Sequence, residues 1–200
     1  MRKVTFGGAN SLDNYIARKD DAVDWLMWSN EAAAVMTDYW KTIDTIVMGR
    51  KTYEVALRMG AGGGASAGMT TYVFSRTMQK SPGKKKIKNL EFVSEDAAAF
   101  VRRLKEQEGK DICVMGGGLL AKSLFEADLI DEIGFNIHPV LLGSGIPLFH
   151  EMNHQIDLEL IECKQFKNGC LLVSYRVKRS NDKGTSKTTG RKRKNKGGAV

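Results

Sequence analysis

Hydrophobic and polar positions alternate in a way that divides the first 178 residues into short apolar runs and helix-like stripes. Short apolar runs bounded by glycine, proline or polar residues are typical of buried strands. Stripes with apolar residues at i, i+3, i+4 and i+7 predict amphipathic helices. The predicted strands are residues 3–9, 45–48, 70–74, 90–93, 111–115, 131–137, 158–166 and 170–177.

Four predicted helices separate these strands. The first has Ser29 or Asn30 as its N-terminal cap, and we expect its apolar stripe to pack on the core. That stripe is Ala32, Val35, Met36, Tyr39, Trp40 and Ile43. A short helix is predicted at residues 50–57. Another begins after Ser94 and ends before Gly109, and the last covers residues 119–128.

The order of these elements predicts an α/β fold. Strands that alternate with helices favour a mostly parallel central sheet with helices on both faces. Asn168-Gly169 lies between the last two strands and is a strong signal for a hairpin. We therefore expect an antiparallel hairpin at the C-terminal side of the sheet.

The net charge of +8 belongs almost entirely to the C-terminal residues. Residues 179–200 contain eight Lys or Arg and one Asp, and residues 1–178 are close to neutral. This segment has no apolar periodicity, so we predict a domain over residues 1–178 followed by a disordered basic tail. Residues 191–194 could bind nucleic acid or serve as a targeting signal, and a solvated tail is the simpler interpretation.

Other compositional features restrict the location of the protein. No apolar stretch is long enough to cross a membrane, and residues 1–6 lead directly into a strand without a signal peptide. The three cysteines, Cys113, Cys163 and Cys170, predict reduced thiols and no metal site, although Cys163 and Cys170 could face each other across the hairpin. We expect a cytoplasmic protein with no bound metal.

Residues 111–121 contain a pattern that suggests phosphate binding. A strand ends in three adjacent glycines, Gly116, Gly117 and Gly118, and a helix follows. Glycines leave the main chain bare, so an anion can approach the N–H groups that begin the helix. A plain strand–helix turn explains the same residues equally well. The glycines are contiguous, so the dinucleotide fingerprint G-x-G-x-x-G is not present.

Two further strand ends have similar chemistry. Gly49 is followed by Arg50, Lys51 and Thr52 at the start of a helix, where cations are unfavourable unless an anion binds. Ser75 and Arg76 follow the strand at residues 70–74, and a guanidinium group matches the oxygens of a phosphate monoester. We interpret the first as a phosphate site, whereas the second is a weaker signal.

Together these motifs resemble the dihydrofolate reductase-like superfamily. Residues 48–54 are similar to the cofactor-binding turn of dihydrofolate reductases, and residues 114–118 are similar to their second glycine turn. Residues 11–17 and 131–149 more closely resemble the reductase domain of the bifunctional riboflavin-biosynthesis deaminase/reductase and its stand-alone relatives. The resemblance covers about residues 2–178.

This resemblance implies a dihydrofolate reductase-like three-layer fold, NADPH as hydride donor, a small heterocyclic or ribosylamino-pyrimidine substrate and a homodimer. It places Gly49, Arg50, Lys51 and Thr52 at the phosphates, and Ser75 and Arg76 at the adenosine 2′-phosphate. It places Ala9, Ile16 and Ala17 beside the nicotinamide. The pyrophosphate and nicotinamide ribose would be lined by Met115, Gly116, Gly117, Gly118, Leu119 and Leu120.

The sequence also departs from these relatives. The helix carboxylate that serves the pterin in dihydrofolate reductases falls near Ala33, and the zinc signature of the deaminase is missing. Asp13 is our candidate for an acid that borders the substrate, and the proton donor is either Asp13 or a water molecule. A structural turn residue explains Asp13 equally well. Alternative functions are dihydrofolate reduction and nucleotide binding without catalysis.

Overall fold

The computed structural model describes residues 1–60, 68–78 and 87–179. Its helices are α1 (Asn30–Lys41), α2 (Arg50–Arg58), α3 (Ala97–Glu106) and α4 (Gly118–Glu126). Its longer strands are β1 (Val4–Ser11), β3 (Ile43–Gly49), β4 (Thr70–Phe74), β5 (Leu90–Val93), β6 (Asp111–Gly116), β7 (Glu132–His138), β9 (Leu158–Gln165) and β10 (Leu171–Val177). Two short strands, β2 (Tyr15–Ala17) and β8 (Ile146–Pro147), form a separate pair.

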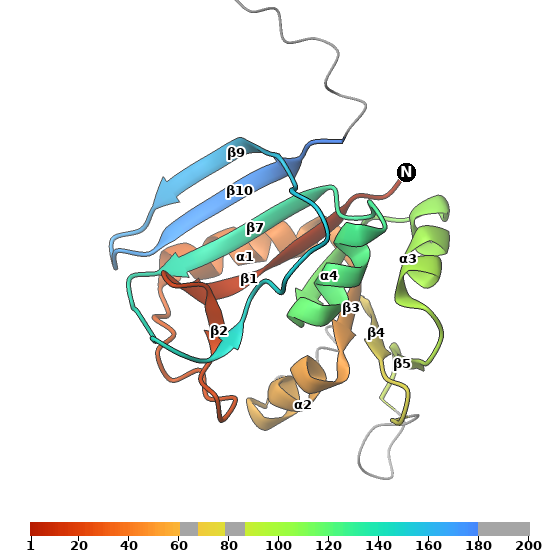
Figure 1. Cartoon of the computed structure of the whole chain (residues 1–200), viewed down its shortest axis with the longest axis horizontal. Helices are drawn as coiled ribbons and strands as arrows, with labels where there is room; N and C mark the ends of the chain where they lie inside the picture. Colours follow the sequence, from red (N-terminus) through yellow and green to blue (C-terminus); the bar gives the residue numbers. More distant parts are fainter. Residues whose placement is uncertain (61–67, 79–86, 180–200) are drawn as a thin grey trace, which may run out of the picture.

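The central sheet has eight strands in the order β5-β4-β3-β6-β1-β7-β10-β9 (Figure 1). Neighbours from β5 to β7 are parallel, whereas β10 is antiparallel to both β7 and β9. The carboxyl ends of β1, β3, β4, β6 and β7 therefore lie along one edge of the sheet. Binding sites of open α/β sheets occur at this edge.

The two faces of the sheet bury separate hydrophobic clusters. Val47 and Val114 face one cluster with α3 and α4, whereas their neighbours Met48 and Cys113 face the other with α1 and α2. This alternation follows from the two-residue period of a strand. Figure 1 shows α3 and α4 in front of the sheet and α1 behind it. The predicted arrangement of helices on both faces is confirmed.

The centre of the sheet opens towards its carboxyl edge. β1 pairs with β6 only through Val4, Thr5 and Phe6, but its pairing with β7 continues to Ser11. The two central strands therefore separate after Phe6. Gly8 lies on the part of β1 that β6 no longer pairs with, and a Cβ atom built on it would have no other atom within 4 Å. We call the opening between β1 and β6, with the strand ends around it, the crevice.

Several local predictions need correction. Asp96, and not Ser94, caps α3, because its carboxylate accepts a hydrogen bond from Ala99 N. The apolar stripe of α1 packs on the core in part: Tyr39 and Trp40 contact it, whereas no residue of α1 is fully buried and Met36 is 41 % exposed. The two loops predicted at residues 11–17 and 138–149 contain the paired strands β2 and β8. Ser29 caps α1 as predicted.

The hairpin prediction at Asn168-Gly169 is confirmed, and Gly169 takes the left-handed φ of +85° that this turn requires. Cys163 pairs with Val173 across the hairpin, so it does not face Cys170, and all three cysteines are free. The predicted basic tail falls almost wholly outside the described residues, as do most of the glycine-rich residues 59–68 and the basic residues 80–88.

Candidate functional site

Two helices begin side by side at the crevice. β3 leads through Gly49 into α2, and β6 leads through Gly117 into α4. β3 and β6 are neighbouring strands, and a Cβ atom on Gly49 would lie 3.7 Å from the main-chain N of Gly117. The turns thus meet, and two helix N-termini point their unpaired N–H groups towards the same region.

These N-termini lack the features that normally satisfy a helix start. Neither α2 nor α4 has a side-chain cap, and neither has an acidic residue in its first turn. By contrast, Ser29 caps α1 and Asp96 caps α3. Free N–H groups and the positive end of the helix dipole favour an anion. Paired turns of this kind suit a ligand with two linked phosphates.

Thr52 lies directly beneath the second glycine turn. Cβ atoms on Gly116 and Gly117 would lie 3.4 Å and 3.6 Å from Thr52 Oγ1, so both glycines leave the main chain close to this hydroxyl. Gly116 also has a φ of +123°, which side chains rarely adopt. The conformation at position 116 therefore favours glycine, whereas the Cβ distances at both positions are ordinary van der Waals contacts.

The side chains on these turns are accessible to a ligand. Arg50 is exposed and pairs with Glu54 one helical turn later, at 2.8 Å. Lys51 is exposed, as is Leu119, with 69 % of its surface accessible. Met115 and Leu120 are partly buried in the packed layers beneath the turns. The structure thus brings the predicted residues of both turns into one region.

A pocket of about 370 Å³ lies at the ends of β4 and β5. Ser75 Oγ accepts a hydrogen bond from Met78 N at 2.8 Å, and Arg76 is exposed beside it. Glu95 pairs with Arg103, and Asp96 caps α3, so each carboxylate of the pocket has a partner. The pocket is lined by Phe74, Ser75, Arg76, Val93, Ser94, Glu95, Asp96 and Ala97.

Asp13 joins two loops at the other side of the crevice. Its carboxylate accepts hydrogen bonds from Ser11 Oγ at 2.6 Å, Leu142 N at 3.1 Å and Gly143 N at 2.7 Å. The bond from Ser11, together with those from the two main-chain groups, lowers the pKa of Asp13. Asp13 is thus an ionised clamp between the loop after β1 and the loop after β7.

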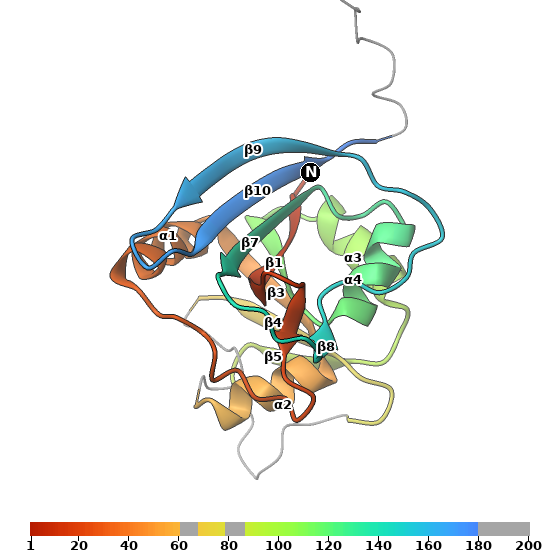
Figure 2. The same cartoon turned by 60° about the vertical axis from the view of Figure 1, so that its left-hand side comes forward.

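The same two loops are held together by their main chains. β2 pairs with β8, Leu12 N donates to Val140 O at 2.9 Å, and a Cβ atom on Gly145 would lie only 2.2 Å from Ala17 O. Both views show β2 and β8 adjacent below the end of β1 (Figures 1 and 2). Ala9, Ile16 and Ala17 are therefore on, or next to, this joined pair of loops.

His138 is a structural residue at the end of β7. It is 2 % exposed, its ring packs edge-on against Trp25 with ring centres 5.3 Å apart, and its Nδ1 accepts from Met27 N at 3.1 Å. Burial lowers the pKa of His138. Trp25 is also buried. Both residues therefore belong to the core, and the hydrogen bond from Met27 attaches the segment before α1 to the sheet.

Some residues of the region were not singled out from sequence. Gly8 lies in the opening of the sheet, and Leu142 and Gly143 supply the N–H groups that Asp13 binds. The apolar residues at the start of β1 gave no sign of where the sheet opens. Main-chain donors leave no residue-type signal, so a motif search could not have found them.

Comparisons with known proteins agree with this geometry. Residues 2–172 match the family model of the RibD C-terminal domain, so the chain belongs to this family. It is 37 % identical over 166 residues to the uncharacterized protein YwjB of Bacillus subtilis, with 82 % of this chain and 92 % of YwjB covered.

Solved structures support the fold. A putative riboflavin biosynthesis protein from Shewanella sp. PV-4 is 26 % identical, with a TM-score of 0.75 and coverage of 90 % of this chain and all of that chain. Dihydrofolate reductase from Enterococcus faecalis, solved with NADP(H), gives a TM-score of 0.61 at 17 % identity, covering 88 % and 97 % of the two chains. The predicted dihydrofolate reductase-like fold is confirmed.

Proposed function

We propose that the protein is an NADPH-dependent reductase that acts on a small heterocyclic substrate. The observation that supports this most directly is the meeting of two uncapped helix N-termini beside the opening between β1 and β6. A dinucleotide would place its pyrophosphate at these turns, its adenosine in the pocket of Ser75 and Arg76, and its nicotinamide at the opening. Membership of the RibD C-terminal family supports the reductase class.

Hydride transfer requires little from the protein besides orientation. The cofactor supplies the hydride, and the chain holds it against the substrate and excludes water. Ala9, Ile16 and Ala17 would border the ring on the clamped side of the crevice. Thr52 and the glycine turns would fix the phosphates. Each of these residues belongs to a strand end, to the first turn of a helix or to the joined loops, so their positions are set before a ligand binds.

Arg76→Ala tests the cofactor assignment. Loss of a charge-assisted hydrogen bond to the 2′-phosphate should raise the Kd for NADPH by about tenfold or more, whereas the Kd for NADH should not change. Quenching of tryptophan fluorescence measures both affinities. Arg102→Ala, an exposed arginine on α3 outside the pocket, is the matched control. Absence of dinucleotide binding to the wild-type chain would contradict the proposal.

We further propose that Asp13 positions the substrate-side loops and that water supplies the proton. A proton donor works best with a pKa near the working pH, but the pKa of Asp13 is lowered and its oxygens already accept three hydrogen bonds. The lowered pKa and the three hydrogen bonds support a structural role for Asp13 over a role as proton donor. The residue still lies beside the expected nicotinamide position.

Asp13→Asn distinguishes the two roles. The asparagine N–H₂ group cannot accept a hydrogen bond, and Leu142 N and Gly143 N donate to different oxygens of Asp13, so amide hydrogen exchange at one of these two residues should become faster at pH 7. In the wild type the clamp should hold above the ordinary pKa of 3.8 and weaken only as the pH falls below it, since the folded-state pKa is lowered. Unchanged exchange in the variant together with a large loss of turnover would instead identify a proton donor.

We also propose that two copies associate through β9. Every residue of this edge strand is exposed, including Leu158, Leu160 and Ile161. Exposed apolar groups that gather on one strand are typical of a protein interface. A homodimer agrees with the expectation from the resemblance.

Sedimentation equilibrium tests the association. Leu160→Lys should produce monomers, because a charge would be buried in an apolar contact. Glu162 pairs with Ser174, whereas Leu160 pairs with Tyr175, the next residue of β10. Because consecutive residues of β10 point to opposite faces of the sheet, Glu162 and Leu160 also lie on opposite faces. Glu162→Lys is therefore the control and should leave the dimer intact. A wild-type chain that sediments as a monomer would refute this proposal.

Dihydrofolate remains the less favoured substrate. Glu31, one of two acids on α1, accepts a hydrogen bond from Lys167 N at 2.9 Å, and Asp38 pairs with Lys41. Ala33 occupies the position where the resemblance places the pterin carboxylate. Neither acid is free to replace it without losing its present partner.

A further inference from the structure

We propose that the substrate is an uncharged or cationic heterocycle and not a phosphate ester. This inference rests on the proposed function and concerns the part of the crevice that the cofactor leaves open. We call the ends of β4, β3 and β6 the cofactor half. We call the ends of β1 and β7, with residues 11–31 and 138–146, the substrate half.

The strand order separates these halves. All three turns that we assign to the cofactor follow β4, β3 and β6, which are consecutive strands on one side of β1. A dinucleotide that occupies these turns reaches β1 only with its nicotinamide end. The molecule that receives the hydride must then lie over the ends of β1 and β7, which carry the joined loops (Figure 2).

The substrate half has an excess of carboxylates. Residues 11–31 contain two cations, Arg18 and Lys19, and residues 138–146 contain no Asp, Glu, Lys or Arg. The acids of residues 11–31 are Asp13, Asp20, Asp21, Asp24 and Glu31. A dianionic phosphate would therefore meet a net negative charge here, which disfavours its binding.

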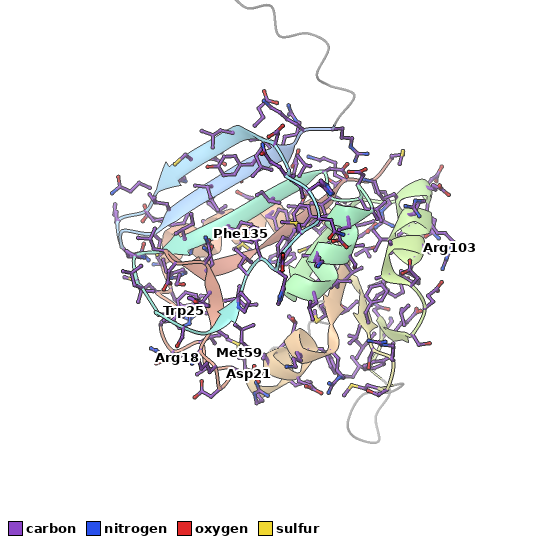
Figure 3. All side chains as sticks on the ribbon, in the orientation of Figure 1. Arg18, Asp21, Trp25, Met59, Arg103 and Phe135 are labelled. Carbon is purple, nitrogen blue, oxygen red and sulfur yellow. The ribbon has the colours of Figure 1, made fainter. Side chains whose placement is uncertain are left out.

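The arginines that reach this region are already paired. Arg18 makes two hydrogen bonds to Asp24, at 2.7 Å and 3.2 Å. Arg58, at the end of α2, pairs with Asp21 at 3.3 Å. Figure 3 shows Arg18 and Asp21 together near the end of α2, below Trp25. A phosphate would have to break these pairs in order to use either guanidinium group.

Among the described residues, two further cations near this region are exposed lysines that lie close to acids. Lys19 is next to Asp20 in the chain, and Lys167 is on the hairpin turn whose main-chain N binds Glu31. An exposed lysine contributes little to the affinity for an anion when a carboxylate lies nearby, since solvent screens the attraction. The two lysines therefore do not form a phosphate site.

The helix at the substrate half also disfavours an anion. Ser29 Oγ already accepts the N–H of Ala32 at the start of α1, and Glu31 is in the first turn. The turns after β3 and β6 show the opposite arrangement, with two uncapped helix starts and no acid in either first turn. Within the described residues, the features that bind phosphate gather in the cofactor half.

Apolar side chains surround the substrate half instead. Trp28 is 80 % exposed, and Leu12, Met27 and Leu141 are also exposed. Leu12 N bonds to Val140 O, and Met27 N bonds to His138, so these residues are held around the ends of β1 and β7. Apolar and aromatic groups with a few polar groups suit a flat heterocycle.

Two-dimensional NMR of the ¹⁵N-labelled chain tests this inference. In the protein saturated with NADP⁺, ribose 5-phosphate should shift none of the amides of residues 11–31 and 138–146. Shifts of these amides that saturate with ribose 5-phosphate would overturn the inference. In the free protein, inorganic pyrophosphate should shift amides of Gly49, Thr52, Gly117 and Leu120. If neither pyrophosphate nor NADP⁺ binds, the proposed function is wrong. The two failures can be distinguished, because binding of ribose 5-phosphate to residues 11–31 and 138–146 contradicts only the inference about the substrate.

Turnover of a matched pair gives a second measurement. NADPH oxidation is followed with a ribosylamino-pyrimidine and with its 5′-phosphate, at equal concentrations. We expect kcat/KM for the phosphate ester to be at least about tenfold lower, equivalent to about 1.4 kcal/mol. An equal or higher kcat/KM for the ester would overturn the inference. If neither compound is reduced, the NMR result decides.

Discussion

Arg2→Met should lower the free energy of unfolding by about 3 kcal/mol, because it removes one partner of a largely buried ion pair. The Arg2 side chain is 5 % exposed and pairs with Asp44. It also donates to Thr45 Oγ1 and to the carbonyl oxygens of Leu104 and Lys110. Methionine fills similar space but removes the ion pair and all of these hydrogen bonds, and Asp44 keeps only neutral donors, among them Thr45 Oγ1 and Lys110 N. The estimate is at the lower end of the usual range because Asp44 is partly exposed.

Urea denaturation at pH 7 measures this loss. Lys3→Met is the control, because Lys3 is the next residue and pairs with Glu132 at 3.2 Å while 52 % of its side chain is exposed. Exposed pairs contribute about 1 kcal/mol or less, so the control should remain close to wild type. Similar losses in both variants would show that the buried contacts of Arg2 contribute little to stability.

Gly7→Ala should destabilise the protein by about 2–3 kcal/mol through overpacking. A Cβ atom on Gly7 would lie 2.7 Å from the carbonyl oxygen of Gly134, its partner on β7. Because this atom belongs to the main chain of a central strand, it cannot move without disturbing the sheet. The midpoint of thermal unfolding should fall by several degrees.

Gly8→Ala is the matched control on the same strand. No atom lies within 4 Å of the position of its Cβ, so the variant should fold with nearly wild-type stability. Its methyl group would project into the opening where we place the nicotinamide. NADPH should therefore bind more weakly to Gly8→Ala even though the fold is intact. A strongly destabilised Gly8→Ala would show that the opening is packed more tightly than the structure indicates.

Much of the fold could be predicted from sequence because its signals are local. Strands such as β4 and β5 fall at their predicted residues, since continuous apolar runs report burial directly. The pairing of β2 with β8 was missed because strands of three and two residues have no measurable period. The cap of α3 was misplaced because Ser94 and Asp96 are both suitable capping residues, and only the backbone distinguishes them.

In the candidate site, too, local motifs could be predicted from sequence and contacts between distant residues could not. Each cofactor turn is a contiguous motif, so its residues could be found together. The partners of Asp13 could not be found, because Leu142 lies 129 positions away and contributes only a main-chain N–H. β9 is exposed because it is the edge strand of the sheet. The alternation of apolar and polar residues in β9 does not specify whether the strand lies at an edge or in the interior of the sheet.

The early end of the pairing between β1 and β6 has a consequence for inhibitor design. Alternate residues of β1 after Phe6 direct their main-chain N–H and C=O groups to the side that β6 has left. A carboxamide placed there could bind to the backbone as a short strand would. A resistance mutation exchanges one side chain for another and leaves the peptide groups in place. An inhibitor that binds to the main chain should therefore keep its hydrogen bonds in such a mutant.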